Sequence, residues 1–366
     1  MGRVTRRRAF TLVELLIVVA VAAMLLAIAF PAVGVSRTAA GLEGSRANLR
    51  QMGVANGEAA AENDGLIAGY DWEGHGGSDP PLYDLGGGDA ATASDNLVAA
   101  QLQQAAICRK ATGRFDASGP RRLPVNYSRL PHRRYNHLPL ADDLGGGLPE
   151  PTFVSPLDVH HQEFQANPYD FADLPAGLPQ YCEADSSWTT SRVVKYWAYG
   201  SSYQCTYYAW TTSRPDEYGN LGLHPSDGGS LLVVDPSRLG RQPMADVAFP
   251  ALKVFYHEEY DYSEGSGNAG RYYADPEASV NVLFFDGSVR RVATADANPG
   301  WDAGAPCDMT ASADLLYESI DTRYFPTYDG NPNGNTYFPG CYKWTRGGLE
   351  GVDTGGDETD TSTWCD

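Results

Sequence analysis

The feature that most constrains this chain is an apolar run that follows Glu14 and contains no charged residue from Leu15 to Val35. About 20 consecutive apolar residues are enough to cross the hydrocarbon of a bilayer as an α-helix. Glu14 is costly at that depth, by about 3 kcal/mol or more, so an acid there normally has a partner and a task. The arginines from Arg6 to Arg8 precede the run and are expected to stay in the cytoplasm. The sequence therefore predicts one membrane-spanning helix, with the rest of the chain on the outer side.

The residues at the start of this run resemble a known processing motif. Phe10-Thr11-Leu12-Val13-Glu14-Leu15, after a short basic leader, is similar to the class III leader and N-terminal helix of type IV pilins and type II secretion pseudopilins. In that family a prepilin peptidase cuts before Phe or Met, and the new N-terminus is methylated. The resemblance implies cleavage between Ala9 and Phe10, with Glu14 at the position where the family keeps its glutamate. Ala9 departs from the usual Gly, and Pro31 falls where many members carry a proline.

The resemblance implies that this helix is an assembly device. The ammonium of a cleaved Phe10 would neutralise the buried Glu14 of a neighbouring subunit and set the axial register. Pro31 lacks a backbone N–H and its ring clashes with the preceding turn, so it marks where the helix can kink or melt. The implied partners are this chain and other pilins, prepilin peptidase, an assembly ATPase, a platform protein and the inner membrane. The implied location is a bacterial inner-membrane precursor with a cytoplasmic N-terminus and a periplasmic head, and then a periplasmic or extracellular filament.

Two simpler interpretations of the apolar run stay open. The first is an ordinary secretory signal, for which Ala27-Ile28-Ala29 supplies a small-x-small cleavage site. The second is a plain single-pass anchor without processing. Glu14 argues against both, because it interrupts the apolar region near its start and neither interpretation gives it a task.

Helical spacing continues beyond the apolar run. Leu49, Met52 and Ala59 recur at helical intervals, and Asp64-Gly65 supplies a stop. A continuous helix from Phe10 to Asn63 would be about 80 Å long at about 1.5 Å per residue. The predicted fold class is α+β, with this long hydrophobic helix packed on a mainly antiparallel β-sheet head. The predicted segments are a leader (1–9), the helix (10–65), a β-rich head (66–345) and an acidic Gly- and Asp-rich tail (346–366).

The head is expected to consist mainly of strands. Asp286-Gly287 between apolar runs is a strong hairpin signal. Gly200-Ser201-Ser202 is expected to turn a second hairpin between residues 193–199 and 203–210. The aromatic residues of that hairpin indicate either a core or sheet face, or a platform that stacks on glycans. The further predictions are strands at 230–234 and 251–256, a short helix at 96–110, and surface loop over 66–100.

Two more motifs extend the resemblance. Asn48-Leu49-Arg50-Gln51 and the segment from Val280 to Arg290 around Asp286-Gly287 are similar to pseudopilin-like proteins of planctomycete-type bacteria. Those proteins often carry a His at a fixed distance before Asp-Gly. Pro276 occupies that position here, so no role tied to the histidine transfers.

Charge limits the partners of the head. The formal net charge is -19, which argues against nucleic acid as the main partner. One interval is basic, with Asp116 as its only acid. It is a solvated loop, a contact for an acidic face of a neighbouring subunit, or a site for an anionic polymer. Its basic residues are Arg109, Lys110, Arg114, Arg121, Arg122, Arg129, Arg133 and Arg134.

The cysteines indicate disulfides. The chain has six of them, all on the predicted outer side, where an even number is typical of disulfide bonds. The predicted pairs are Cys182 with Cys205 and Cys307 with Cys341, because each pair brackets a strand or loop unit.

One segment has the pattern of a calcium loop. Asp329, Asn331, Asn333 and Asn335 alternate around a Gly turn, as in the first half of such a loop. Gly340 stands where the bidentate Glu belongs, so a plain Asn/Gly turn is the other interpretation. Major pseudopilins of type II secretion carry calcium in a C-terminal loop, and the resemblance therefore implies calcium as the one candidate cofactor. The acidic tail, which includes Asp353, either contributes to such a site or is disordered.

No catalytic signature is present in the sequence. His257-Glu258-Glu259 lacks the second histidine of a zinc-protease helix, and there is no Gly-x-Ser-x-Gly elbow or phosphate loop. We therefore expect a structural subunit of a type IV pilus or type II secretion pseudopilus, and not an enzyme. The alternative is a minor pseudopilin or tip subunit whose large head binds secreted cargo or surface glycan.

Overall fold

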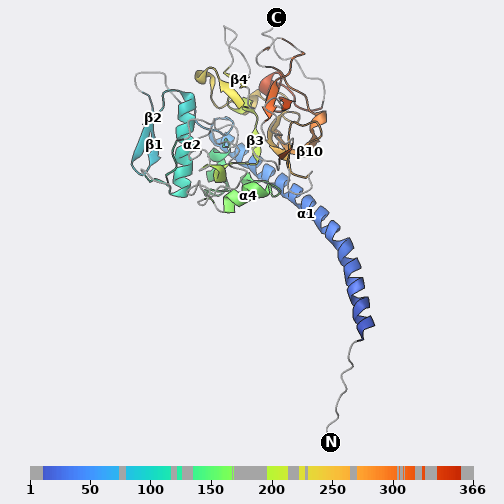
Figure 1. The fold of residues 1–366 in the computed structure, drawn as a ribbon. Coiled ribbons are helices and arrows are strands. Elements are labelled where there is room, and N and C mark those ends of the chain that lie inside the picture. The colour runs from blue at the N-terminus through green and yellow to red at the C-terminus, as the bar shows by residue number, and fades with distance from the viewer. Residues whose placement is uncertain are drawn as a thin grey trace.

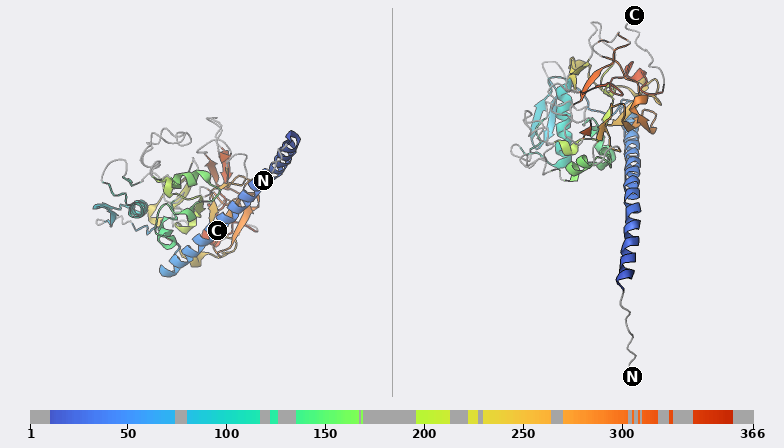
Figure 2. Two further views of the ribbon diagram at one scale, coloured as in Figure 1. Left: turned by 90° about the horizontal axis from the view of Figure 1, so that it is seen from below. Right: turned by 45° about the vertical axis from the view of Figure 1, so that its right-hand side comes forward.

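The computed structural model shows a long helix that carries an α+β head (Figure 1). Helix α1 (Leu12–Glu62) leaves the head as a rod, and its second half lies within the head (Figure 2). The sheets are mostly antiparallel, so the predicted fold class is confirmed. The structure describes residues 11–73, 80–116, 122–125, 135–166, 168, 196–212, 222–226, 230–263, 270–302, 305, 308, 310–317, 324–325 and 336–355.

Helix α1 is continuous over 51 residues, as its helical spacing predicts. Pro31 lies inside the helix without ending it, and the rod curves as it leaves the head (Figure 1). Leu49 and Met52 are fully buried, whereas the residues before Val35 are exposed. One helix therefore serves as a free rod over its first half and as part of the core over its second.

A four-stranded antiparallel sheet forms the centre of the head. Its strand order is β10 (Val289–Ala293), β9 (Ser279–Phe284), β6 (Val254–Glu258) and β3 (Tyr203–Cys205). The predicted Asp286-Gly287 hairpin joins β9 to β10 and is confirmed, and Gly287 has a φ of 81°, which glycine adopts without strain.

The two faces of β9 belong to two hydrophobic cores. Leu283 packs in one core with Leu49 and Met52 of α1. Val282 and Phe284 point to the other face and pack in a second core that includes Tyr273. This alternation follows from the two-residue period of a strand. Helix α1 therefore covers one face of the central sheet.

Smaller elements surround this sheet. The predicted strand at 230–234 is present as β5 (Ser230–Val233), which pairs with β4 (Leu223–Ser226). The remaining strands are β7 (Tyr260–Asp261), β8 (Gly270–Tyr272), β11 (Asp314–Tyr317), β12 (Tyr324–Phe325) and β13 (Thr336–Pro339). Two short helices are α3 (Ala141–Leu144) and α4 (Val159–Ala166). The 3-10 helices of the described residues are Leu138–Leu140, Pro151–Phe153, Trp197–Tyr199, Tyr207–Ala209, Pro236–Arg238, Met244–Asp246, Thr294–Asp296 and Gly348–Glu350.

The region predicted as a loop over 66–100 contains a hairpin. Strand β1 (Leu82–Gly86) pairs antiparallel with β2 (Asp89–Thr92). The glycines from Gly86 to Gly88 have positive φ and form its turn. Helix α2 (Asn96–Thr112) follows, as predicted for residues 96–110.

The hairpin predicted across Gly200-Ser201-Ser202 is wrong for the residues that the structure describes. Residues Trp197–Tyr199 form a 3-10 helix, and β3 pairs with β6. Ser202 donates its backbone N–H to the Phe153 carbonyl at 3.0 Å, and Ser201 Oγ donates to the same oxygen at 2.8 Å. The serines therefore attach this segment to a distant part of the chain and do not close a tight turn.

The aromatic residues of this region form core and not an exposed platform. Trp210 stacks on Trp72 with the ring centroids 5.3 Å apart. The glycan-stacking interpretation is wrong for the aromatic side chains that the structure describes here, because all of them are buried: Tyr196, Tyr199, Tyr203, Tyr207, Tyr208 and Trp210.

The basic interval that begins at Arg109 is not one solvated patch. Arg109 is 1% exposed, and its Nε donates to the Leu123 carbonyl at 2.7 Å. Its Nη1 pairs with Asp89 at 2.7 Å, and Arg122 reaches the same carboxylate at 3.4 Å. Arg114 is also buried, whereas Lys110 is exposed. The other basic residues of the interval, Arg121, Arg129, Arg133 and Arg134, lie outside the described residues.

The first part of the predicted acidic tail packs into the head. Asp353 accepts the Val254 N–H at 2.8 Å and pairs with Lys253 Nζ at 2.9 Å. The two charged side chains are 2% and 0% exposed, and Thr345 forms hydrogen bonds with both. The C-terminal segment is therefore fastened to the start of β6.

Candidate assembly site: helix α1 and its joint with the head

The N-terminal end of α1 is organised around Glu14. Thr11 is the N-cap, and its backbone N–H and hydroxyl each donate to Glu14 Oε2 at 2.8 Å. In return, the Glu14 N–H donates to Thr11 Oγ1 at 3.3 Å, which completes a capping box. The carboxylate is therefore held at the very start of the helix, next to the predicted cleavage point.

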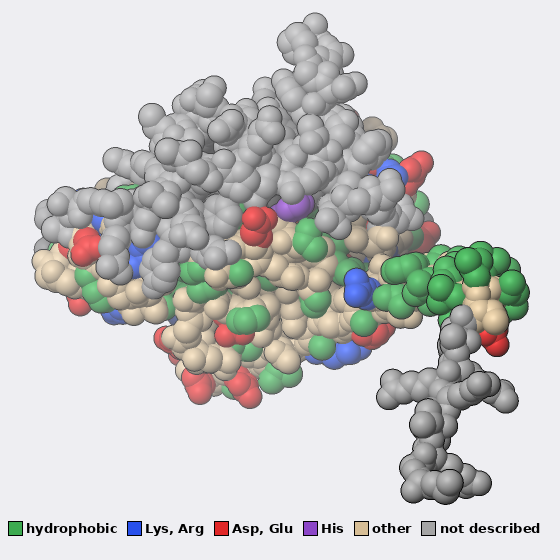
Figure 3. All heavy atoms as spheres, turned by 60° about the horizontal axis from the view of Figure 1, so that its bottom comes forward, with side chains coloured by type: hydrophobic (Ala, Val, Ile, Leu, Met, Phe, Trp, Pro, Cys, Tyr) green, Lys and Arg blue, Asp and Glu red, His purple; other side chains and the backbone are tan. Residues whose placement is uncertain are grey.

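The apolar surface of α1 is uncovered. The described large hydrophobic side chains from Leu12 to Val35 are 46–80% exposed. Figure 3 shows this part of the helix covered by hydrophobic side chains and projecting from the head. The helix is long and apolar enough to cross a membrane. Soluble monomers rarely expose such a continuous apolar surface, and surfaces of this kind are typical of membrane or protein contact sites.

Glycines let the head approach the second half of α1 closely. A Cβ on Gly41 would lie 2.3 Å from Leu157 Cδ2, and one on Gly44 would lie 2.9 Å from Pro156 Cγ. Ordinary carbon contacts are about 3.5–4.0 Å, so side chains of the head rest directly on the helix backbone at these two positions. Gly57 differs, because nothing lies within 4 Å of a Cβ placed there.

Alanine substitutions at Gly41 and Gly57 are expected to have opposite effects. Ala is a better helix former than Gly by about 1 kcal/mol, so Gly57→Ala should raise the free energy of unfolding by about 0.5–1 kcal/mol. At Gly41 the added methyl group would be overpacked against Leu157, at a cost of about 1–3 kcal/mol. This cost should exceed the gain in helix propensity, so Gly41→Ala should lower the free energy of unfolding. Denaturant unfolding of the full chain in detergent, followed by Trp fluorescence, measures both. An equal rise in the free energy of unfolding for both variants would contradict the close contact between Gly41 and Leu157.

The Asn48-Leu49-Arg50-Gln51 motif fastens a head segment to α1. Asn48 Nδ2 donates to the Val154 carbonyl at 2.9 Å, and Gln51 Oε1 accepts from Thr152 Oγ1 at 3.2 Å. Leu49 lies between them in the sequence and is fully buried. The motif thus combines one core side chain with two polar contacts to the same short segment.

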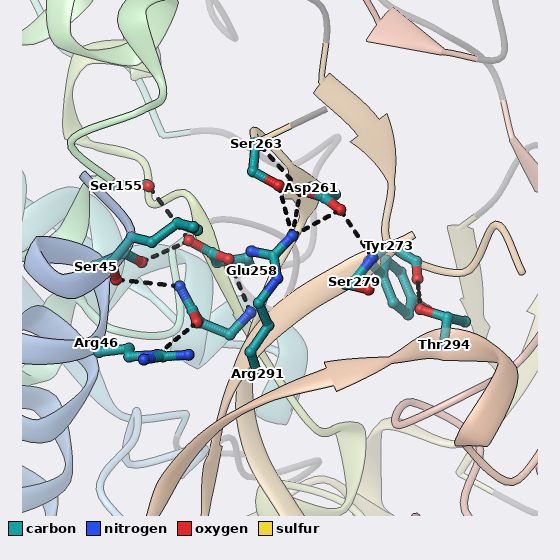
Figure 4. Close-up of polar contacts among 12 residues, drawn as sticks. Ser45, Arg46, Ser155, Glu258, Asp261, Ser263, Tyr273, Ser279, Arg291 and Thr294 are labelled. Atoms are coloured by element: carbon teal, nitrogen blue, oxygen red, sulfur yellow. Dashed lines mark hydrogen bonds and ion pairs between the residues drawn. The ribbon is translucent and has the colours of Figure 1, made fainter. Parts of the chain in front are cut away.

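One buried carboxylate, that of Glu258 at the end of β6, joins α1 to the sheet (Figure 4). Ser45 Oγ of α1 donates to its Oε1 at 2.5 Å, and Ser155 Oγ donates to the same oxygen at 3.3 Å. The Asn281 N–H of β9 donates to its Oε2 at 2.8 Å. Burial raises the pKa of Glu258, while the hydrogen bonds from Ser45 and Asn281 act in the opposite direction.

The neighbouring acid, Asp261, has a cation of its own. Arg291 Nη2 lies 2.9 Å and 3.0 Å from the two carboxylate oxygens of Asp261 and 2.5 Å from Ser263 Oγ. Asp261 Oδ2 also accepts the Ser279 N–H at 2.8 Å (Figure 4). Arg291 therefore forms its ion pair with Asp261. Its positive charge only lowers the pKa of Glu258 from a longer distance.

Several predicted site residues lie outside the described residues. They are the cleavage-site pair Ala9 and Phe10, the calcium-loop residues Asp329, Asn331, Asn333 and Asn335, and the cysteines Cys182 and Cys307. Cys205 and Cys341 are described and buried, and neither forms a disulfide among the residues that the structure describes. Burial raises the pKa of Cys205 to about 12, which suits an unreactive core thiol.

The sequence predicted that α1 packs on the head, but it did not predict the Glu258 carboxylate at this joint. Glu258 was considered only within a failed zinc motif, and its partner Ser45 lies 213 positions away in the sequence. One local signal was present. Ser45 shares the buried stripe of α1 with Leu49 and Met52, and a polar residue on a core-facing stripe needs a buried partner.

The comparisons with known proteins bear on the N-terminal end of this site. Residues 4–30 match the family described as the prokaryotic N-terminal methylation motif. No curated protein and no solved structure matches the chain. The matched residues contain Glu14 and the first turns of a membrane-capable helix, which fits anchoring of a precursor in the inner membrane. The match covers only the N-terminal end of the chain, and it supports a pilin-like precursor that is processed by prepilin peptidase.

Proposed function

We propose that the chain is cut between Ala9 and Phe10 and that its mature form assembles through α1 into a type IV pilus or type II secretion pseudopilus. The observation that carries this proposal is the methylation motif on a helix whose apolar surface the described head leaves uncovered. Lipid covers that surface before assembly, and the α1 helices of neighbouring subunits cover it afterwards. The head, residues 66–345 with the tail that follows, forms the exterior.

Within this proposal Glu14 sets the register between subunits. Its carboxylate is held by Thr11 of its own chain, so it is hydrogen-bonded while the subunit waits in the membrane. On assembly it exchanges these neutral donors for the ammonium of a neighbouring Phe10. An ion pair in a low-dielectric filament core is stronger than hydrogen bonds from neutral donors to the same carboxylate, which favours the exchange.

Processing is tested by the N-terminus of the mature chain. Mass spectrometry of protein isolated from its host should find a methylated Phe10 as the first residue, and cells without prepilin peptidase should keep the leader. Ala9→Gly is the matched control, because it restores the usual residue before the cut and should be processed at least as well. A mature N-terminus just after Ala29 would instead support an ordinary signal peptide and overturn the proposal.

A second candidate is a minor or tip subunit whose head contacts cargo or glycan. The size of the head favours it, because a chain of 39.5 kDa is bulky for a repetitive fibre. Purified filaments separate the two roles, since a major subunit makes up most of the filament mass and a minor subunit is found at low copy number or at one end.

A further inference from the structure

Three parts of the molecule meet at the Glu258 carboxylate. It receives hydrogen bonds from Ser45 of α1, from Ser155 in the segment before α4, and from the Asn281 backbone of β9. Glu258 itself is 1% exposed. Any change in this group therefore acts on the attachment of the rod to the sheet.

Glu258 has no ion-pair partner among the described residues: its direct hydrogen-bond donors are neutral, and the charge of Arg291 acts on it only at longer range. A buried charge without a counter-ion costs free energy that the same group avoids when it is protonated. The hydroxyls of Ser45 and Ser155 can donate or accept, and Ser45 Oγ also lies 3.0 Å from Tyr203 Oη. A proton on Glu258 Oε1 can therefore be accommodated when the Ser45 hydroxyl turns to accept it and donates to Tyr203 Oη instead, without breaking the joint.

The charged and titratable groups around Glu258 come from several elements. On α1, Arg46 pairs with Glu43 and its Nε donates to Asn281 Oδ1 at 3.2 Å. The other groups that face this region are Tyr203 of β3, Asp158 before α4, Asp261 of β7 and Arg291 of β10. The ring of His257 contacts the Glu258 backbone carbonyl and packs against Tyr273 of the second core. Asp158 accepts from Ser202 Oγ at 2.7 Å, and Asp261 is paired with Arg291. None of them supplies a direct counter-ion to Glu258.

We propose that Glu258 is a proton-sensitive latch between the rod and the head, which holds α1 more firmly when the carboxyl is protonated than when it is ionised. This inference goes beyond the proposed function, because it concerns a joint inside one subunit and holds whether or not the chain forms filaments.

The sign of the effect follows from the burial of Glu258. Burial raises its pKa in the folded chain above the ordinary value of 4.5. Its contribution to stability is therefore largest below that ordinary value and declines as the pH rises through the raised one. The other acidic residues of this chain, 46 in total with Glu258, also titrate in acid, so the effect must be read from a difference between variants at the same pH.

The test compares the full-length wild type with Glu258→Gln in detergent between pH 5 and pH 8. Gln keeps the shape and stays neutral, so its Tm should exceed that of the wild type at pH 8 by about 2–4 °C, with a gap that narrows toward pH 5. Amide exchange in residues 42–52 of α1 should be slower in the variant at pH 8. Glu58→Gln, an exposed carboxylate on the same helix, is the control and should show no such pH-dependent gap.

A second variant keeps the proposal falsifiable if Glu258→Gln folds poorly. Ser45→Ala removes a hydrogen bond that lowers the pKa of Glu258, so the window in which stability declines should move to higher pH. A Tm gap that does not change with pH, or exchange that changes evenly over the head and not in residues 42–52, would overturn the latch.

Discussion

Glu14→Ala is expected to reduce filament yield by about 100-fold or more while the head remains folded. Removing one partner of a desolvated charge pair costs about 3–5 kcal/mol, and each 1.4 kcal/mol is tenfold in an equilibrium constant. The substitution also removes the acceptor for the two Thr11 donors, which adds a smaller capping loss of about 1 kcal/mol. Sheared filaments quantified by electron microscopy and immunoblotting give the yield, and the membrane fraction shows whether the precursor is still inserted.

Glu14→Gln separates the charge of this residue from its role in the cap. Gln retains an oxygen that accepts from Thr11, but it is neutral and cannot neutralise the ammonium of a neighbouring chain. If charge pairing sets the register, Glu14→Gln should assemble as poorly as Glu14→Ala. Normal assembly of Glu14→Gln would show that the cap alone matters, and normal assembly of both variants would remove Glu14 from the assembly proposal.

Asp353→Ala is expected to lower the free energy of unfolding by about 3–5 kcal/mol. The substitution leaves Lys253 fully buried without its counter-ion, 2.9 Å from where the carboxylate was. Burial lowers the pKa of Lys253, and Asp353 acts in the opposite direction. Loss of Asp353 should therefore favour the neutral amine. Denaturant unfolding followed by Trp fluorescence measures the change, and a loss below about 1 kcal/mol would contradict a tightly coupled pair.

The double variant Lys253→Met/Asp353→Leu tests whether the loss of stability in Asp353→Ala comes from the unpaired charge of Lys253. Replacing both charges by apolar groups removes the burial cost together with the attraction, so much of the lost stability should return. The Val254 N–H also donates to Asp353 and would be left without this acceptor, which limits the recovery. A double variant as unstable as Asp353→Ala would indicate that Asp353 acts mainly through its hydrogen bonds.

The parts of the fold that the sequence predicted correctly depend on local pattern. Composition and helical spacing predict α1, and Asp286-Gly287 predicts the β9–β10 hairpin. The failed hairpin at Gly200-Ser201-Ser202 had an equally clear local signal. The serines of this segment instead donate hydrogen bonds to the carbonyl of Phe153, which lies 48 positions before Ser201 in the sequence. A distant partner therefore decided that segment, and no local pattern contains it.

In the candidate site too, the sequence predicts local contacts but not distant ones. The motif around Glu14 could be recognised from the sequence because its contacts lie within one helical turn. The hydrogen bonds of Glu258 at the joint could not be predicted in this way, because its partners Ser45 and Ser155 lie 213 and 103 positions away in the sequence. Arg109 shows the converse error. A dense basic stretch is normally solvated, yet Asp89 and a backbone carbonyl draw this side chain inside.

The continuity of α1 has a mechanical consequence. No loop separates the free rod from the half that lies in the head, and the contacts with the head are spread along the helix from Gly41 to Ala60. A pull along the rod therefore loads these contacts together in shear, and a twist of the rod turns the central sheet with it. Such a subunit would pass torque as well as tension to its exterior, as a rigid lever does and a tethered domain does not.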